Sequence, residues 1–486
     1  MNRGASAMAM AALLCACTVE HRVDLSVPLA PGPFRQAGAS VASTEVAPRM
    51  GSAWPVLFGD PQMAHLIELA LEQNLDIRQA NARIDLARAA VTASRAELAP
   101  QVNAGAEYSR SRASGTIDNA LPKRMMRTWA AAADVTYTVD WTGALRGEAA
   151  AAESNAIATE ADAEVAKLRV ATEVAVDYLT LHYVDEDIAV LARSVALRET
   201  AVKLVEARSR VGNTSDLDVL RARTEWQTTR AELAESQRLR ANLVDAMAVL
   251  LGQSAATFAL VSAGAAAGTL QMPPVPVGLP ADVLAQRPDI YAAGRRLDAA
   301  AWSVGVARTA WLPQLTLTAD GGFASRSLSE FLDRNSSLWG LATSLALPLF
   351  DGGRRDAALA SAQARYTLDE AAYRGVAYDA LREVQDALND IAAGRERIAE
   401  FDAAAATSNQ VAQLSRRRYT LGYVDYFEVV DSDRDALSIK RDAIHARQAL
   451  AVATVGLVRA LGGGWSAPQS AQTARAALAA SGVAAR

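Results

Sequence analysis

The sequence predicts a mainly α-helical chain of two similar halves, each holding one pair of β-strands and one pair of long antiparallel helices. Three observations predict this fold: short motifs recur about 210 residues apart, the hydrophobic period switches to two in each half, and long stretches lack glycine and proline. The composition agrees, because 51% of the 486 residues are hydrophobic but only 6% are aromatic, which is typical of long-helix proteins. Length alone suggests roughly three globular domains, whereas the duplication predicts one elongated chain of two similar halves.

The N-terminus has the pattern of a bacterial secretory signal that ends in a lipobox. Arg3 supplies the basic region, residues 5–14 are apolar, and Leu14 is followed by Cys-Ala-Cys. This pattern predicts a lipoprotein in which residues 1–16 are removed and Cys17 carries the acyl chains, including palmitate. An ordinary signal peptide with a stray cysteine is the alternative.

The only two cysteines, Cys15 and Cys17, both lie in this signal region, so we expect no disulfide and no thiol catalysis in the rest of the chain. Residues 17–58 contain several prolines and few apolar clusters, which predicts an extended tether. No run of 18 or more apolar residues follows residue 20, so the usual transmembrane-helix signal is absent.

The internal repeat defines the organisation of the remaining chain. Matching motifs stand at a nearly constant offset: Asp76-Ile77 with Asp289-Ile290, Pro100-Gln101 with Pro313-Gln314, Gly143 with Gly352, Gly212 with Gly422, and Leu251-Gly252 with Leu461-Gly462. We therefore predict a first repeat at 59–256, a connector at 257–280, a second repeat at 281–465 and a disordered tail at 466–486.

Each repeat begins with residues at helical spacing, over 60–98 and 281–312, and then changes to strict alternation. Val102 to Tyr108 and Ala133 to Trp141 alternate apolar with polar residues in the first repeat, which predicts a β-hairpin within 100–142. The same pattern predicts a second β-hairpin within 313–350.

A very long helix follows each predicted hairpin. Residues 148–211 contain neither glycine nor proline, and apolar residues repeat every seven positions from Val174 to Val202, as in a coiled coil. A second apolar stripe from Val165 to Leu179 indicates a helix packed on two neighbours, which favours a wall of helices over a two-helix stalk. Turn signals near 212–218 and 422–431 predict the tips at which the chain returns as a second helix.

Four strands form an open sheet whose edge groups could not remain unpaired in a membrane. A closed membrane barrel needs at least eight strands, so membrane insertion would require several copies, and a homotrimer is the simplest solution. The loops 109–128 and 324–338 would then face the exterior. Aromatic residues near the strand ends fit either membrane girdles or a protein core: Tyr108, Trp129, Trp141, Trp311, Phe323, Trp339 and Phe350.

Several short motifs stand on this duplication in a fixed order: the lipobox at Cys17, Leu98-Ala99-Pro100-Gln101, Arg287-Pro288-Asp289-Ile290, Trp311-Leu312-Pro313-Gln314, Pro348 to Gly353, Arg418 to Gly422, and Leu461 to Trp465. In these motifs the chain resembles the outer-membrane efflux proteins of TolC and OprM type, especially the lipoprotein exit ducts of resistance-nodulation-division (RND) drug pumps. The resemblance covers almost the whole chain after residue 17.

The resemblance implies a homotrimer with a 12-stranded outer-membrane β-barrel continued by a 12-helix periplasmic α-barrel. Such a duct would be anchored in outer-membrane lipid through Cys17. It would accept drugs from an inner-membrane RND transporter through a periplasmic adaptor protein and release them outside, which would contribute to antibiotic resistance. It would perform no chemistry and would need no cofactor.

The resemblance also implies a gate at the periplasmic tip. By position after Gly422, Asp431 would form a ring of three carboxylates and Phe427 an apolar ring one turn away. Related proteins often carry leucine where Phe427 stands, which would make this ring tighter or differently shaped. Three carboxylates near one axis repel one another and would bind cations. Candidate latch residues between the helix pairs are Asp216, Asp218, Arg418 and Tyr419.

Other classes of function have less support in the sequence. The four histidines are isolated, so neither a metal site nor a catalytic site is expected, and the net charge of −5 argues against nucleic-acid binding. Two alternatives remain open: an outer-membrane duct for type I protein secretion, and a periplasmic coiled-coil lipoprotein without a pore. The predicted strands with alternating apolar and polar residues argue against the coiled-coil lipoprotein, because a helical scaffold does not require such strands.

Overall fold

The computed structural model describes residues 19, 21–27, 34, 54–114, 125–260, 272 and 280–466. Cys17, the expected signal peptide 1–16 and nearly all of the expected tail lie outside the described residues. The chain divides into two compact units, each of which takes segments from both repeats: Met1–Ser26, Ala82–Glu160 and Ala292–Arg374 in the first unit, and Val27–Asn81, Ala161–Tyr291 and Gly375–Arg486 in the second.

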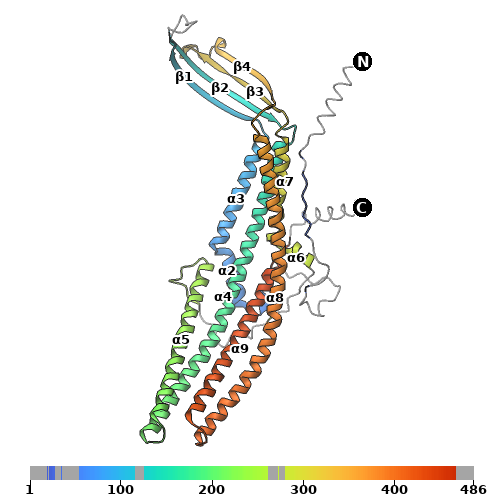
Figure 1. Cartoon of the computed structure of the whole chain (residues 1–486). Helices are drawn as coiled ribbons and strands as arrows, with labels where there is room; N and C mark the ends of the chain where they lie inside the picture. The colour runs from blue at the N-terminus through green and yellow to red at the C-terminus, as the bar shows by residue number, and fades with distance from the viewer. Residues whose placement is uncertain are drawn as a thin grey trace, which may run out of the picture. The chain divides into compact units, whose positions relative to one another are not determined.

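The two halves of the chain contain helices of matching length. The long helices α4 (Ala144–Arg210) and α8 (Arg354–Thr420) each have 67 residues. The returning helices α5 (Asp216–Leu250) and α9 (Tyr426–Ala460) each have 35 residues. Within the second unit, α5 runs antiparallel beside α4, and α9 beside α8 (Figure 1). The predicted duplication and the predicted long helical hairpins are therefore confirmed.

The helical segment that precedes each hairpin is interrupted, which periodicity alone did not predict. In the first half, α2 (Pro61–Gln73) and α3 (Leu75–Ala96) follow a short 3₁₀ helix, η2 (Trp54–Phe58). In the second half, α6 (Pro280–Gln286) and α7 (Pro288–Thr309) take the corresponding places.

Each break bonds to the end of a returning helix. The side-chain oxygen of Asn74 accepts a hydrogen bond from the backbone N–H of Ile77 (3.2 Å), which caps α3, while its Nδ2 donates to the carbonyl of Leu250 (2.8 Å). In the second half, Arg287 is buried and its Nη1 donates to the carbonyl of Ala460 (2.8 Å). These side chains satisfy terminal carbonyl groups that helix geometry leaves without partners.

The first unit contains one antiparallel sheet in the order β1-β2-β3-β4 (Figure 1). Its strands are β1 (Gln101–Arg112), β2 (Met125–Val139), β3 (Gln314–Ser325) and β4 (Ser337–Ala346), so both predicted hairpins are present. Pairing of β1 with β2 continues to Arg112 opposite Met125, so the expected loop 109–128 is wrong at both ends. The expected loop 324–338 is likewise shorter, because β3 extends to Ser325 and β4 begins at Ser337. The backbone pairing of the strands extends beyond the residues with alternating apolar side chains, from which the loop boundaries were inferred.

The register gives the sheet one apolar and one polar face. Directly paired residues share a face, so Val102 with Val135 and Tyr108 with Trp129 belong to the apolar face, and Leu341 of β4 continues it opposite Ala319. The opposite face carries polar pairs, including Asn103 with Asp134, whose side chains are hydrogen-bonded at 3.1 Å, and Asp134 with Asp320. In a single chain this apolar face is exposed to solvent: Trp339 is 79% exposed and Leu341 is 76% exposed.

The core of the second unit forms where α4 packs on α2 and on the ends of the returning helices. Val174 and Leu179 of α4 are fully buried there, together with Met63 of α2 and Val455 of α9. Most residues of the heptad stripe predicted on α4 are therefore buried, as expected. A smaller cluster nearer the turns joins Val205 of α4 to residues of α5 and α9.

Residues 21–27 carry no regular secondary structure, and in the first unit this segment is bonded to α7. The His21 ring stacks on Trp302 with ring centroids 4.2 Å apart, and its Nε2 lies 2.8 Å from Oδ1 of Asp298. Among the described residues, no helix combines the length and the apolar character needed to cross a bilayer.

Candidate functional site

The two helix-to-helix turns have the same backbone geometry. Gly212 and Gly422 have φ values of +75° and +79°, a region that favours glycine. At the first turn the N–H of Asn213 donates to the carbonyl of Arg208, and at the second the N–H of Tyr423 donates to that of Arg418, both at 2.9 Å. These six-residue bonds form the Schellman arrangement that ends a helix at a glycine. The duplication thus extends to the closing bonds of each tip.

The expected gate residues lie one turn apart at the start of α9. Phe427 is 53% exposed, and the side chain of Asp431 is 45% exposed. Arg434, three residues on, forms an ion pair with Asp431 at 2.7 Å. The guanidinium of Arg221 on α5 lies over the Phe427 ring, 5.1 Å from its centroid, at cation–π distance. Both residues are therefore available to a neighbouring molecule, and Phe427 also links the two hairpins of one chain.

The expected latch residues do not form one cluster. Asp216 accepts a hydrogen bond from Ser209 at 2.9 Å, and Asp218 accepts one from Thr214 at 2.8 Å, so both carboxylates are bonded within the first hairpin. These bonds order the first turn of α5, whose N-terminus is capped by Ser215.

The other two expected latch residues, Arg418 and Tyr419, make different contacts. Arg418 approaches Glu428 of its own hairpin at 3.4 Å. Tyr419 reaches the other hairpin, where the guanidinium of Arg208 lies 4.9 Å from the centroid of its ring. Its hydroxyl group is buried and has no hydrogen-bond partner among the described residues. Tyr419 is therefore the one of the four for which the structure records a contact between hairpins.

A cavity of about 330 Å³ between the hairpins holds charged residues that the sequence analysis missed. Arg198 of α4 is 12% exposed and donates from Nη1 to Glu225 (2.7 Å) and Thr229 (2.6 Å) of α5. Across the cavity, Arg416 of α8 pairs with Asp433 of α9 at 3.0 Å.

Burial dominates the electrostatics of this cavity. It raises the pKa of Asp433, although Arg416 acts in the opposite direction. It also raises the pKa of Tyr426 to about 12, with the charge of Asp433 adding to the effect. The walls therefore carry a neutral phenol and a carboxylate whose desolvation cost is opposed by the charges of Arg416 and Arg198.

A second buried ion pair joins the hairpins further along α4 and α9. Asp187 has a side-chain exposure of 6% and accepts hydrogen bonds from Arg441 at 2.8 and 3.2 Å and from Ser236 of α5 at 2.9 Å. Arg441 also reaches Glu232 of α5 at 3.1 Å. No local pattern signals this cluster, because Asp187 and Arg441 are far apart in sequence and each has the appearance of a surface charge.

In the part of the chain that the structure describes, no group of three or more histidine, cysteine, aspartate or glutamate side chains is placed to hold a metal ion. The arrangement at the tips offers exposed acidic and aromatic side chains together with buried ion pairs between hairpins. Such an arrangement can hold two helical hairpins together or let them separate.

The fold and these paired tips define an outer-membrane efflux protein. Residues 66–253 and 279–463 match the family model described as "Outer membrane efflux protein", so the chain belongs to this family. The two matched segments fall on the two repeats.

Individual relatives extend over nearly the whole chain. It is 30% identical over 474 residues to the outer membrane protein OprJ of Pseudomonas aeruginosa, which covers 96% of this chain and 97% of OprJ. It is 28% identical to the cation efflux system protein CusC of Escherichia coli O157:H7, over 85% of this chain and 88% of CusC. The solved structure of the outer-membrane channel OprN superposes with a TM-score of 0.83 at 26% identity, covering 93% of this chain and 100% of OprN.

Proposed function

We propose that the protein is the outer-membrane exit duct of a tripartite efflux pump, through which drugs or other small molecules leave the cell. The observation that carries this proposal is the four-stranded sheet with one apolar face, in which each edge strand pairs on one side only among the described residues. Family membership and the names of the relatives, which include efflux-system proteins and an outer-membrane channel, point to the same function.

The sheet requires further copies of the chain to become complete. β1 and β4 are its two edges, and each pairs with a single neighbour within the chain. In hydrocarbon every backbone N–H and C=O needs a partner, so β1 of one copy would pair with β4 of the next. Three copies give a closed barrel of a size usual for outer-membrane proteins, with the apolar face toward lipid and the polar face toward the lumen.

The helical hairpins would extend the duct into the periplasm and meet the periplasmic adaptor of an inner-membrane RND transporter. Their charged residues occur as ion pairs along the helix surfaces, as expected for walls around water. A wall of this kind positions no reacting groups. The protein would act by opening and closing, with no catalytic step and no cofactor.

Asp431 and Phe427 would close the resting duct at its tip. Their exposure in a single chain and their spacing of one turn support this role, because three copies would place three carboxylates and three phenyl rings in adjacent layers. Tyr419 would contribute to the latch between hairpins through Arg208, whereas Asp216, Asp218 and Arg418 would stabilise each tip from within. Cys17 would anchor the chain through its acyl groups.

Cross-linking tests the closure of the sheet. Ala106→Cys in β1 is combined in turn with cysteines at successive positions of β4, and the chain is oxidised in isolated outer membranes. If β1 meets β4 of another copy, one register gives covalent dimers and trimers. The matched control, Ala106→Cys with Ala131→Cys in β2, joins two residues that are paired within one sheet and leaves a monomer. Monomers at every β4 position would refute the closed oligomer.

Conductance and transport assays test the duct itself. In planar bilayers, Asp431→Ala and Phe427→Ala should each raise the conductance of the resting channel, and Asp431→Ala should weaken block by divalent cations. Glu400→Ala, an exposed carboxylate on α8, is the matched control and should change neither. Wild-type conductance in both gate variants would remove these residues from the gate. Restored drug tolerance in a strain that lacks its own duct supports efflux, whereas restored export of a secreted protein alone supports type I secretion.

A further inference from the structure

Two arginines face each other at one end of the sheet. Arg110 of β1 pairs directly with Arg127 of β2, and both side chains are exposed. Like charges at directly opposed positions of an antiparallel pair destabilise it. The pairing therefore calls for a partner that neutralises both guanidinium groups at once.

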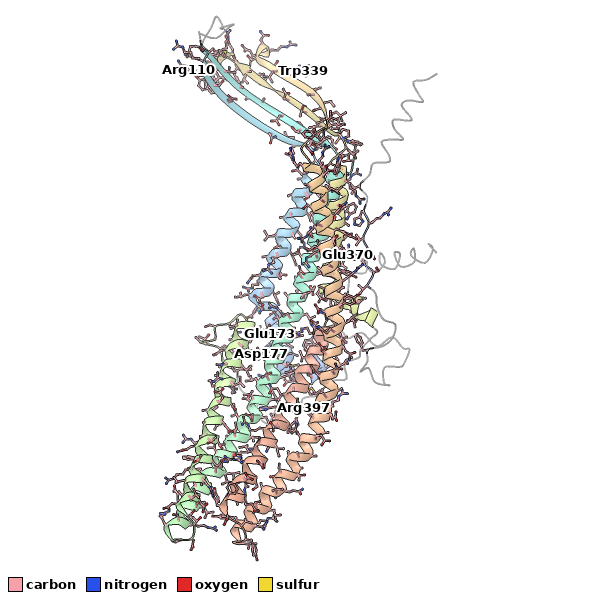
Figure 2. All side chains as sticks on the ribbon, viewed as in Figure 1. Arg110, Glu173, Asp177, Trp339, Glu370 and Arg397 are labelled. Atoms are coloured by element: carbon pink, nitrogen blue, oxygen red, sulfur yellow. The ribbon has the colours of Figure 1, made fainter. Side chains whose placement is uncertain are left out.

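The arginine pair continues the apolar face of the sheet. Tyr108 and Trp129, the adjacent pair on the same face, have ring centroids 4.4 Å apart. Arg112, two residues beyond Arg110, belongs to this face as well. Within the first unit, Arg110 lies at the end of the sheet away from the helices (Figure 2). Three guanidinium groups thus lie directly beyond an aromatic pair at the rim of an apolar surface.

No carboxylate in the described part of the chain forms an ion pair with Arg110 or Arg127. The acidic residues within the strands are Glu107, Asp134 and Asp320. By the alternation of strand residues and the register, all three belong to the opposite face. The positive charge at this rim is therefore not balanced from within the sheet.

We propose that Arg110 and Arg127, together with Arg112, bind the phosphate groups of lipid headgroups in the outer leaflet of the membrane. This inference rests on the proposed function, since it requires the apolar face to lie in lipid. Tyrosine and tryptophan favour the level at which hydrocarbon meets the headgroups. Arg110 stands two residues further along the strand, about 7 Å at a rise of about 3.4 Å per residue, which is the level of the phosphates.

The guanidinium group suits this ligand. Its planar array of donors binds a phosphate through two parallel hydrogen bonds, and a phosphate between two arginines removes their repulsion. A lipid with phosphates at both ends of its headgroup would engage several of these side chains. The acyl chains of the same lipid would cover the exposed apolar face below, so headgroup and chains would bind together.

Lipid binding to the detergent-solubilised full-length oligomer tests the proposal, with bound lipid counted by native mass spectrometry. The probes are bisphosphorylated lipid A, the same lipid with both phosphates removed, and inorganic phosphate as a competitor. The double variant Arg110→Gln with Arg127→Gln should bind the bisphosphorylated lipid about tenfold more weakly than the wild type. Arg397→Gln, which removes one exposed positive charge from α8, should bind it as the wild type does (Figure 2).

A charge reversal separates binding from folding. In Arg110→Glu the new carboxylate would pair with Arg127 across the strands, so the oligomer should remain intact while lipid affinity falls as far as in the double variant. Equal binding of the dephosphorylated lipid, displacement by inorganic phosphate, or unchanged affinity in both variants would each overturn the proposal. In planar bilayers whose lipids carry no phosphate, the conductance of the double variant should match that of the wild type. A wild-type chain that forms no channel would instead refute the proposed function.

Discussion

The buried ion pair between Asp187 and Arg441 leads to a prediction about which partner matters more. Replacing either residue breaks the same bonds, but the two replacements leave different groups behind. Arg441→Ala leaves a carboxylate that is 6% exposed and retains the hydroxyl of Ser236. Asp187→Ala leaves a guanidinium that is 25% exposed and retains Glu232 at 3.1 Å.

These remainders set the magnitudes. Removing one partner of a buried pair costs about 3–5 kcal/mol when the other is left buried and uncompensated, and the carboxylate of Asp187 approaches this limit. Water and Glu232 reduce the corresponding cost for Arg441 to about 1 kcal/mol. A difference of about 2 kcal/mol corresponds to roughly a thirtyfold difference in the equilibrium for local opening. The hydrogen bond to Asp187 raises the pKa of Arg441, so this guanidinium stays charged around neutral pH.

Amide hydrogen exchange measured by mass spectrometry on the oligomer reads this opening locally. In peptides that cover residues 183–190 and 436–446, exchange should accelerate much more in Arg441→Ala than in Asp187→Ala. Arg238→Ala is the control, because it breaks an exposed ion pair with Glu235 on one helix and should leave exchange unchanged. Equal acceleration in the two test variants, or a larger effect of Asp187→Ala, would show that desolvation of the carboxylate is not the controlling quantity.

Three further predictions concern the long helices and their turns. Burial, reinforced by Glu173 one turn away (Figure 2), raises the pKa of Asp177 to about 6. The native state then holds a proton that the unfolded chain releases near pH 4, so stability is lost as the pH rises from about 4 to about 6, by about 2 kcal/mol after allowance for partial exposure. Asp177→Asn should raise the thermal midpoint at about pH 7.5 and match the wild type at about pH 4, and a constant difference at all pH values would exclude this cause. At Gly422 and at Gly375, in the interior of α8, an added Cβ meets nothing within 4 Å, so only the backbone conformation distinguishes the two positions. Gly422→Ala should destabilise the tip by about 1–2 kcal/mol because Gly422 has a positive φ. Gly375→Ala should stabilise α8 by about 0.5–1 kcal/mol because alanine favours a helix interior more than glycine does. Equal signs in denaturant titrations would contradict that explanation. Ser215→Ala removes the N-cap of α5 and should cost about 1 kcal/mol, visible as faster amide exchange in the first turn of that helix.

The sequence predicted the parts of the fold that depend on local periodicity. The duplication, both hairpins of strands and both hairpins of helices follow from repeated patterns, and α4 buries the heptad stripe that contains Val174 and Leu191. Element ends were less predictable. The break at Asn74 combines a local cap, in which its side chain accepts from the N–H of Ile77, with a hydrogen bond to Leu250 far along the chain. The break before Pro288 has a local signal in the proline itself.

The candidate site was predictable only in part, for a related reason. Phe427 and Asp431 were chosen through the family resemblance, and their role in a gate stays a prediction, although a single helix sets their spacing. The partner of Phe427, Arg221, could not be predicted, since the contact depends on how α5 packs against α9. Arg198 and Arg441 belong to buried ion pairs but have the sequence environment of surface residues, so only the packing of the hairpins reveals them.

The unpaired edges of the sheet have a consequence for the supply of the protein. If β1 and β4 find partners only on other copies, folding of the strands is completed by association, and a lone chain retains an exposed apolar face. By mass action, the amount of a three-copy assembly at low concentration rises with the third power of the free chain, so halving the chain leaves about one eighth of the assembly. The abundance of finished ducts would therefore change more steeply than gene expression itself, so a modest change in synthesis would produce a larger change in the number of ducts.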